Sequence, residues 1–332
     1  MAFGSLYTQL FPPKPTLNEG NVPSQNGRVF IVTGGNSGVG YELCKILYET
    51  GATIYMTSRS QDRAAKATKA ISETASLTKT PGTIKFLHLD LNNLESVKSA
   101  AASFALQEPK LDVLWNNAGT GGYRVASFAK TAQGLESMVG MHCVATLLFT
   151  RLLEPQLRAA SSPSGATRVV WTSSIVSDQG VPPNGIDFGL LDTGTEDRVR
   201  NYAVSKVGSW MLSREMARRW GEHGIVSIAQ NPGNVKAGSY EGTPAATMFF
   251  LNRILHDPKF GAYTELYAGL SPDITLDDNG AYVIPWGRIR SDGECPRQDV
   301  IRAMVPEEDG GLGYCSKFWA WCEQQWQPYV QL

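Results

Sequence analysis

The stretch that decides the fold is Arg28-Val29-Phe30-Ile31-Val32-Thr33-Gly34-Gly35-Asn36-Ser37-Gly38-Val39-Gly40, followed by a helical pattern that stops at Gly51. Its first five residues form an apolar, β-branched run that can be buried on both faces, as in a parallel sheet. The glycines permit a tight turn, close approach of backbone to a pyrophosphate, and close packing of helix on strand. The N-terminus of the helix would then face the anion. A strand, a glycine-rich turn and a helix in this order predict a nucleotide-binding βαβ unit.

The second predicted strand, residues 52–58, ends immediately before Arg59. An acidic residue at this place would bind the ribose 2′-hydroxyl of NAD, whereas an arginine suits the 2′-phosphate of NADP. Arg63 and Lys66 make the local field positive. We therefore predict NADP(H) as the cofactor; the alternative is a solvated arginine at a helix start.

The third predicted strand, residues 84–90, ends in Asp90, with Leu91 next to it. A carboxylate there can accept a hydrogen bond from an adenine amino group. The alternative is that Asp90 caps the helix expected at residues 94–105.

The strands and helices alternate from residue 28 to residue 235, which predicts a right-handed, doubly wound parallel sheet of the Rossmann type, flanked by helices. The fourth strand, residues 111–115, runs into Asn116-Asn117-Ala118-Gly119, whose amides can bridge neighbouring strand ends. The fifth strand, residues 168–174, ends in two serines. Sites in such sheets lie at the carboxyl ends of the strands, so Ser174 is expected in the same crevice as the glycine turn.

The rest of the chain is less regular. We expect an extended N-terminal arm over residues 1–27 and one Rossmann-type domain over residues 28–332. The predicted elements after the sixth strand (225–230) are helices at 245–256 and 262–270, a last strand at 281–286, and an apolar-striped helix at about 313–329 that packs on the body of the domain.

Tyr202 and Lys206 lie near the start of a helix predicted from Asp197 to Trp220. A four-residue gap puts both side chains on one helix face, one turn apart. A phenol ionises near pH ~10, and an adjacent ammonium group favours the phenolate, so Lys206 is expected to lower the pKa of Tyr202. Taken alone, the pair fits two solvated surface residues better than a functional pair.

Composition excludes several classes of protein. The chain of 332 residues has a formal net charge of −1 and no basic block, which argues against partners such as nucleic acid or an anionic membrane surface. No apolar run is long enough for a membrane span or a signal peptide. The five cysteines are scattered and form no Cys-x-x-Cys pair, so a reducing, cytoplasmic location is expected, with no metal site.

Together the motifs resemble those of the short-chain dehydrogenase/reductase family over roughly residues 28–240. The motifs that carry the resemblance are Thr33-Gly34-x-x-x-Gly38-x-Gly40, Asn116-Asn117-Ala118-Gly119, Ser174, Tyr202-x-x-x-Lys206 and Pro232-Gly233. The long gap between Ser174 and Tyr202 is similar to that of the retinol-dehydrogenase-like branch. The stretches at 261–267 and 282–287 look like those of fungal members, many of which serve secondary metabolism.

The resemblance implies an NADPH-dependent oxidoreductase. Ser174 would hydrogen-bond the carbonyl oxygen of the substrate, Tyr202 would act as general acid or base, and Lys206 would hold the nicotinamide ribose. Implied cofactor contacts are Gly34, Asn36, Ser37, Gly38, Val39, Gly40, Arg59, Asp90, Leu91, Asn117, Ala118, Gly119, Tyr202, Lys206, Pro232, Gly233 and Val235.

A substrate loop is implied at about residues 238–258. Its large side chains (Tyr240, Met248, Phe249, Phe250, Leu251) suit a small apolar carbonyl or alcohol, although they fit a protein core as well. Relatives often pair through the fourth and fifth helices of the family fold. The C-terminal extension would either cover that surface or add to it, which leaves homodimer and monomer open.

Two positions depart from the family pattern. His142, within a long helix predicted from Gln133 to Leu157, stands where the family usually has an asparagine that helps place a water behind the lysine. We hypothesise that His142 replaces this asparagine; the alternative is a satisfied core histidine. Ala237 stands where a hydroxyl often contacts the nicotinamide carboxamide. These departures keep a second class open, an NADP-binding protein that catalyses a non-redox step such as cyclisation or dehydration, or acts as a scaffold.

Overall fold

A single mixed sheet forms the centre of the molecule. The computed structural model describes residues 2–75, 80–162 and 166–330, without the side chains of residues 2–5, 239 and 250. In this part of the chain the sheet has eight strands in the order β3-β2-β1-β4-β5-β6-β7-β8. The strands are β1 (Val29–Val32), β2 (Thr53–Ser58), β3 (Thr83–His88), β4 (Val113–Asn116), β5 (Thr167–Thr172), β6 (Ile225–Gln230), β7 (Tyr282–Ile284) and β8 (Arg288–Arg290).

The predicted doubly wound parallel sheet is confirmed. Every neighbouring pair from β3 to β7 is parallel, and only β7 and β8 are antiparallel. The strand order reverses between β1 and β4, and this switch point is where ligands bind in open α/β sheets. Strands β1, β4 and β6 are buried along their whole length, which explains why their sequences are mostly apolar and do not alternate with polar residues.

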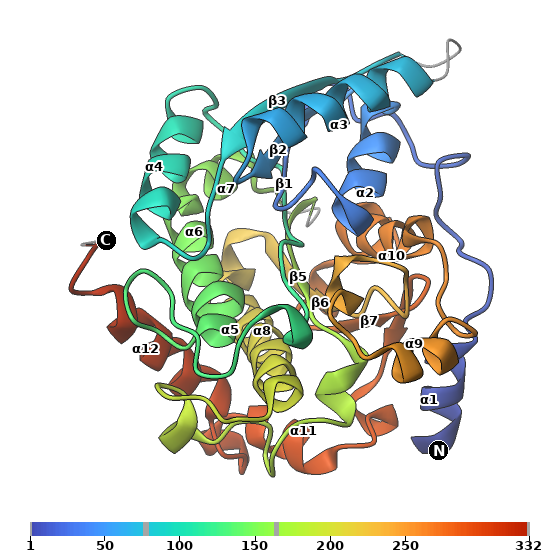
Figure 1. The fold of residues 1–332 in the computed structure, drawn as a ribbon. Coiled ribbons are helices and arrows are strands. Elements are labelled where there is room, and N and C mark those ends of the chain that lie inside the picture. Colours follow the sequence, from blue (N-terminus) through green and yellow to red (C-terminus); the bar gives the residue numbers. More distant parts are fainter. Residues whose placement is uncertain (1, 76–79, 163–165, 331–332) are drawn as a thin grey trace.

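Helices cover both faces of the sheet, as Figure 1 shows. One apolar core lies between the sheet and α2 (Gly38–Tyr48), α3 (Gln61–Thr74) and α10 (Pro258–Leu270). The opposite core lies under the helices α4 (Leu94–Ala105), α5 (Ser137–Val139), α6 (Thr146–Leu152), α7 (Glu154–Ala160), α8 (Arg198–Trp220), α11 (Gln298–Met304) and α12 (Tyr314–Trp326). In the described part of the chain, no helix combines the length and apolarity that a membrane crossing requires.

The long helix predicted from Gln133 to Leu157 starts later and is interrupted. It begins at Ser137, where the Glu136 carboxylate accepts a hydrogen bond from the Val139 N–H at 2.8 Å. Residues 140–145 then form a π-helical segment before α6 begins. Such segments are rare and frequently lie at functional sites. This one contains His142.

The N-terminal arm is not fully extended. Residues Ala2–Leu10 form helix α1, so the prediction of an extended arm is wrong there. The helix is held at its C-terminal end, where the Gln9 side chain is 2% exposed and the Thr8 carbonyl accepts a hydrogen bond from Arg288 at 2.8 Å. These partners lie more than 160 residues away in sequence, so no local pattern could reveal them.

The C-terminal third differs from expectation in its details. The helix predicted at 245–256 ends as α9 (Ala245–Leu251), because the chain turns so that His256 can pair with Val235 in a β-bridge. Helix α10 begins at Pro258, earlier than predicted, after the Asp257 cap. The predicted C-terminal helix is present as α12, with its apolar stripe buried. Short elements β8 and α11 were not predicted.

Candidate active site

The glycine turn after β1 has the shape that its sequence requires. Gly34 and Gly38 have φ angles of +67° and +56°, a backbone region that favours glycine. A Cβ on Gly40 would lie 2.5 Å from Asn117 Nδ2 and 2.7 Å from the Gly34 carbonyl oxygen. Side chains at these positions would therefore distort the turn or push it away from β4.

The N-terminus of α2 leaves room for an anion. Ser37 is the N-cap residue but its side chain makes no capping hydrogen bond, and the first turn has no acidic residue. Ser37 is exposed and Asn36 half-buried, whereas Val39 faces inward against α10. Unfilled backbone N–H groups at a helix N-terminus form an anion site, so this turn fits the pyrophosphate of a dinucleotide.

Arg59 lies at the carboxyl end of β2, as predicted. It is exposed, and no residue that the structure describes forms a hydrogen bond or ion pair with its guanidinium group. Arg63 and Lys66 on α3 are exposed as well. This edge of the nucleotide crevice thus carries three positive side chains that remain available to a 2′-phosphate.

Asp90 lies at the end of β3 with Leu91, which packs on the core. The alternative that Asp90 caps the next helix is wrong, because Asn93 is the cap and accepts from the Glu95 N–H at 3.1 Å. One carboxylate oxygen of Asp90 accepts from the Asn92 N–H at 3.0 Å. Its other oxygen is unused by hydrogen bonds within the described residues.

The asparagine motif after β4 joins two strand ends, as expected. Asn117 Nδ2 donates to the Thr33 carbonyl at 2.8 Å, and the Ala118 N–H donates to Thr33 Oγ1 at 2.8 Å. A Cβ on Gly119 would lie 3.2 Å from His142 Nε2 and 3.3 Å from Lys206 Nζ. The small residues of this motif therefore lie between the glycine turn and Lys206.

The loop after β6 lies at the same edge of the sheet as the glycine turn. Gly233, with φ +83°, donates its N–H to Asn231 Oδ1 at 3.0 Å, directly after Pro232. Val235 is buried and forms a β-bridge with His256. The two hydrogen bonds of this bridge are donated by the backbone N–H groups of Lys236 and His256, so the Val235 N–H does not take part in it. Ala237 lies opposite Gly38: its Cβ would be 3.5 Å from a Cβ added to Gly38.

Ser174 and Tyr202 meet at the rim of the crevice. Ser174 follows β5, and Tyr202 lies in the second turn of α8, whose cap Asp197 accepts two backbone N–H bonds. Burial raises the pKa of Tyr202 to about 12, a hydrogen bond with Ser174 opposes this rise, and Tyr240 adds to it. The predicted lowering of this pKa by Lys206 is therefore wrong: burial is the largest influence on the phenol, and the Lys206 Nζ lies over the face of the tyrosine ring, 5.6 Å from its centroid.

The Ser174 hydroxyl also has a local bond. Its Oγ accepts from the Val176 N–H at 3.5 Å, which is long for a hydrogen bond. The Ser174 oxygen is the acceptor in this weak local bond, so its O–H group remains free to donate.

Lys206 is buried behind Tyr202, with its side chain directed at the strand end. Its Nζ donates to the Thr172 carbonyl at 3.0 Å. Burial lowers the pKa of Lys206 to about 8, and nearby Cys143 and Glu265 oppose this change. An amine poised near neutral pH has an adjustable charge, which is typical of functional sites.

His142 is a buried residue with both ring nitrogens engaged. The Thr120 N–H donates to Nε2 at 3.0 Å, and Nδ1 lies 2.8 Å from Ser205 Oγ. Burial and then the Lys206 charge hold the pKa of His142 well below its usual value. The ring therefore has the hydrogen-bond partners expected of a buried core histidine, which was the alternative interpretation. The same two bonds connect the asparagine motif to α8 close to Tyr202.

Sequence reasoning missed a polar group beneath Lys206. Thr172 Oγ1 donates to Glu265 Oε1 at 2.7 Å and accepts from Gln230 Nε2 at 3.0 Å. Glu265 is fully buried, and burial raises its pKa to about 8. The available signal was a lone carboxylate within the otherwise uncharged segment 260–270. This group extends the site through the sheet to α10.

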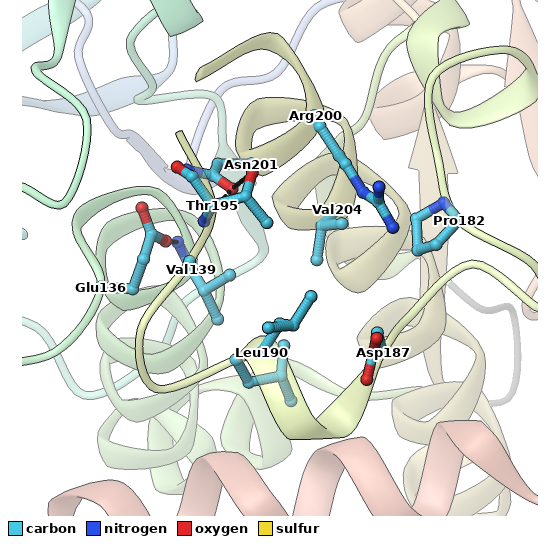
Figure 2. A pocket seen from close by; sticks show the side chains of 11 residues that line it. Glu136, Val139, Pro182, Asp187, Leu190, Thr195, Arg200, Asn201 and Val204 are labelled. Carbon is cyan, nitrogen blue, oxygen red and sulfur yellow. Dashed lines mark hydrogen bonds between the residues drawn. The ribbon is translucent and has the colours of Figure 1, made fainter. Parts of the chain in front are cut away.

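A separate cavity lies on the other side of α8 (Figure 2). It encloses about 340 Å³, part of it open to solvent, between α5, the segment 187–195 and α8. Its α8 residues Arg200 and Val204 lie on the opposite helix face from Tyr202 and Lys206. This cavity is therefore not part of the crevice described above.

Known proteins match the chain over most of its length. Residues 28–186 match the model of the short chain dehydrogenase family. A short-chain dehydrogenase/reductase of Pestalotiopsis fici, named iacJ, is 46% identical, with 98% of this chain and 99% of that protein covered. The expected likeness to fungal members is thus confirmed.

Solved structures share the fold. An uncharacterised protein from Mycobacterium paratuberculosis superposes with a TM-score of 0.64 at 26% identity, covering 93% of this chain and 97% of that one. The NADPH-bound carbonyl reductase from chicken fatty liver gives a TM-score of 0.60 at 21% identity, covering 82% and 97%. With the site geometry and the full-length similarity to iacJ, these matches identify the chain as a nicotinamide-dependent oxidoreductase that belongs to the short-chain dehydrogenase/reductase family.

Proposed function

We propose that the protein is an NADPH-dependent reductase that converts a carbonyl group of an apolar small molecule to an alcohol. The observation that carries the proposal is the Ser174 hydroxyl lying close enough to the Tyr202 phenol to lower its pKa, with Lys206 buried behind the tyrosine. Two hydroxyl groups at one rim of a nucleotide crevice are suited to a substrate oxygen that gains a proton.

The protonation state of Tyr202 supports reduction. With a pKa of about 12, the phenol keeps its proton at neutral pH and can donate it. The reduced nicotinamide, when bound, supplies the hydride to the carbonyl carbon. Ser174 donates a hydrogen bond to the carbonyl oxygen as negative charge develops there, and Tyr202 delivers the proton to the same atom. The alcohol leaves, and Tyr202 regains a proton from solvent.

Lys206 is proposed to act on both tyrosine and cofactor. Its ammonium group would stabilise the phenolate that remains after proton transfer, and one of its protons would reach a ribose hydroxyl. Nζ uses one hydrogen bond on the Thr172 carbonyl, which leaves two N–H groups of a charged lysine for these partners. The near-neutral pKa of about 8 makes this role dependent on pH.

NADP rather than NAD is proposed from the positive side chains at the end of β2. Arg59 occupies the position where NAD enzymes carry an acidic residue. The other proposed contacts are the glycine turn Gly34–Gly40, Asp90 and Leu91 for the adenine, the strip Asn117–Gly119, and the backbone of Pro232, Gly233 and Val235. The NADPH in the chicken carbonyl reductase structure supports this choice by analogy.

The substrate is proposed to lie under the loop at 238–258. Tyr240, largely buried, is close enough to raise the pKa of Tyr202, and its hydroxyl donates to Asn234 at 3.3 Å. Phe249 is 60% exposed, and the side chain of Phe250 lies outside the described residues. The likeness to fungal proteins makes a secondary metabolite the proposed substrate class.

The test follows loss of reduced-nicotinamide absorbance when purified protein meets a panel of hydrophobic ketones and aldehydes. Tyr202→Phe should lower kcat by about 10²- to 10⁴-fold while NADPH affinity is retained. Tyr240→Phe, which keeps the ring beside the site, is the matched control and should retain turnover. Tight NADPH binding without turnover of any compound would favour the non-redox alternative.

A further inference from the structure

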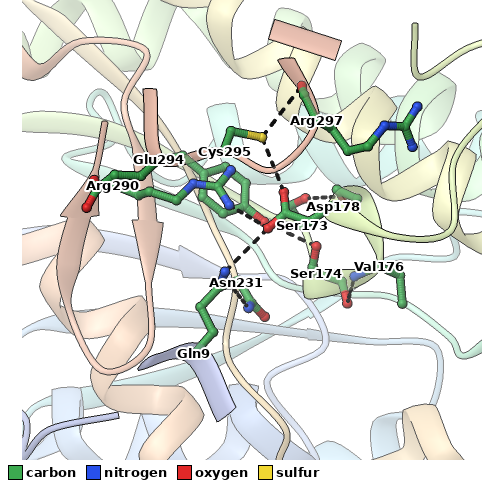
Figure 3. Close-up of polar contacts among 12 residues, drawn as sticks. Gln9, Ser173, Ser174, Val176, Asp178, Asn231, Arg290, Glu294, Cys295 and Arg297 are labelled. Atoms are coloured by element: carbon green, nitrogen blue, oxygen red, sulfur yellow. Dashed lines mark hydrogen bonds and ion pairs between the residues drawn. The ribbon is translucent and has the colours of Figure 1, made fainter. Parts of the chain in front are cut away.

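Gln9, near the end of helix α1, connects two loops of the active site (Figure 3). It is the only α1 side chain among those described that is fully buried, at 2% exposure. Its amide group makes one hydrogen bond in each direction, as a donor on one side and an acceptor on the other. Neither partner is a neighbour in sequence.

On one side Gln9 contacts the segment that follows Ser174. Gln9 Nε2 donates to Asp178 Oδ2 at 3.3 Å. Asp178 ends the short helical turn Ile175–Asp178, for which Ser174 is the N-cap residue. The position of Asp178 therefore controls the direction in which the turn presents Ser174.

The Asp178 carboxylate is anchored from the C-terminal region too. Arg290 of β8 forms an ion pair with the same oxygen, and the side chains of Arg290 and Asp178 are 1% and 2% exposed. The Cys295 thiol donates to Oδ1 at 3.7 Å. Nearby, the Tyr282 hydroxyl donates to the Ser174 carbonyl at 3.2 Å. The serine turn is thus fixed from three separate parts of the chain.

On the other side Gln9 contacts the loop after β6. Asn231 Nδ2 donates to Gln9 Oε1 at 2.9 Å, and Asn231 Oδ1 accepts from the Gly233 N–H at 3.0 Å. These bonds hold Pro232 and Gly233, the proposed wall of the nicotinamide site. Asn231 is 2% exposed, so water cannot readily replace these bonds.

We propose that Gln9 is a positioning residue that fixes the spacing between Ser174 and the Pro232-Gly233 loop, so that helix α1 completes the active site. The inference rests on the proposed reductase function. The neutral amide of Gln9 satisfies both neighbours, since it gives a donor to the Asp178 carboxylate and an acceptor to the Asn231 amide. Misplacement of reacting groups by about 1 Å can cost about 10²-fold in rate, so a spacing residue has a measurable effect.

The two bonds can be separated by substitution. Gln9→Met keeps the length of the side chain and removes both bonds, and it should lower kcat about tenfold and weaken NADPH binding about threefold or more. Gln9→Glu, when ionised, keeps the acceptor for Asn231, loses the donor to Asp178 and adds a negative charge beside that carboxylate. It should therefore lower kcat while NADPH affinity, measured by fluorescence titration, stays near that of the wild type.

A further readout needs no turnover. Hydrogen exchange of the Gly233 amide in the protein alone should be faster in Gln9→Met than in the wild type, because Asn231 loses its support. Tyr7→Ala is the control on the same helix, since Tyr7 is 63% exposed and contacts the exposed Phe11. It should leave kcat, NADPH affinity and Gly233 exchange unchanged.

The outcomes separate this inference from the proposed function. If the wild type reduces carbonyl compounds but Gln9→Met and Gln9→Glu match it within about twofold, the positioning role is wrong. Equal losses in Tyr7→Ala and Gln9→Met would also overturn it, because general docking of α1 would then be the cause. If Gln9→Met does not fold, Gln9→Glu decides alone: loss of kcat with retained NADPH affinity supports the inference, and any other result contradicts it. Absence of wild-type turnover would instead count against the reductase function.

Discussion

His142 Nε2 accepts a hydrogen bond from the backbone N–H of Thr120 at 3.0 Å, and this bond fixes the tautomer of the ring. Because Nε2 is an acceptor, the proton of the neutral imidazole lies on Nδ1, where it is donated to Ser205 Oγ. The Ser205 hydroxyl in turn donates to the Tyr202 carbonyl at 2.7 Å. A π-helical residue thus connects the loop after β4 with the turn of α8 that carries the tyrosine.

The first prediction concerns substitution of this histidine. His142→Asn can offer an acceptor and a donor from the same helix position and should retain most of the turnover. His142→Leu leaves the Thr120 N–H without its acceptor and removes the donor to Ser205 Oγ, at a cost of about 1–3 kcal/mol in unfolding free energy. It should also lose most of its kcat. Equal rates for the two variants, measured alongside urea unfolding, would show that the ring does not support the site.

The second prediction concerns cofactor choice. Arg59→Ala removes a positive side chain that has no partner among the described residues. It should weaken NADPH binding about 10- to 100-fold, the effect expected when a charge-assisted hydrogen bond to phosphate is lost. Binding of NADH, which lacks the 2′-phosphate, should be unchanged. Arg253→Ala, on the substrate loop, is the control with the same loss of charge. An equal decrease for both dinucleotides would contradict the assignment of Arg59 to the 2′-phosphate.

Local sequence signals were sufficient for the parallel strands β1 to β7 and for the order of the motifs at their carboxyl ends. Strand β1, the glycine turn and the Tyr202–Lys206 spacing depend on residues close together in the chain, and the structure has them where predicted. Contacts over long separations were not predictable in this way. Glu265 reaches Thr172 across 93 residues, and Gln9 reaches Asn231 across 222.

The predicted direction of the Tyr202 pKa shift was wrong for a similar reason. Proximity to Lys206 is visible in the sequence, but the degree of burial depends on how the whole domain packs around the phenol. The π-helical segment was hidden too. Apart from Gly140 it contains no helix breaker, and the bond from Thr146 Oγ1 to the Met141 carbonyl at 2.9 Å, which spans five residues, has no signature in the sequence.

The third prediction concerns assembly. Helix α12 covers α8, where Phe318 lies so close that a Cβ on Gly208 would be 2.8 Å from its ring. Arg219 of α8 stacks over Trp319, 4.9 Å from the ring centroid. The family resemblance implies that relatives pair through this helix, and α12 covers it here, so we expect a monomer in sedimentation velocity at micromolar concentration. A stable dimer whose cross-links include α8 would contradict this expectation.

The fourth prediction concerns pH and the buried pair Lys206 and Glu265. Both have a pKa of about 8, since burial lowers that of the lysine and raises that of the carboxyl group. Each residue, when charged, favours the charged form of the other. Glu265→Gln removes the negative charge and should move the pKa of Lys206 further down. If the charged lysine serves the reaction, the alkaline fall of kcat/KM should then occur at lower pH than in the wild type.

The same substitution should change the pH dependence of stability. In the unfolded chain Glu265 ionises near pH 4.5, whereas the folded protein keeps its proton up to about pH 8. Between these values the folded state binds more protons, so this group makes unfolding free energy fall as pH rises. Between pH 5 and pH 8, the unfolding free energy of Glu265→Gln should therefore fall by a few kcal/mol less than that of the wild type, as measured by urea unfolding.

Thr172→Val is the matched control for Glu265→Gln. The hydrogen bond from Thr172 lowers the pKa of the Glu265 carboxyl group, so its loss should raise that pKa and carry the fall in stability to higher pH, opposite to the effect of Glu265→Gln. Lys206 keeps its carbonyl acceptor at residue 172, because that bond uses the backbone. If both variants shift the stability profile in the same direction, loss of packing rather than the charge of Glu265 is responsible. A wild-type slope that survives Glu265→Gln would show that the carboxyl group is ionised in the folded protein at neutral pH.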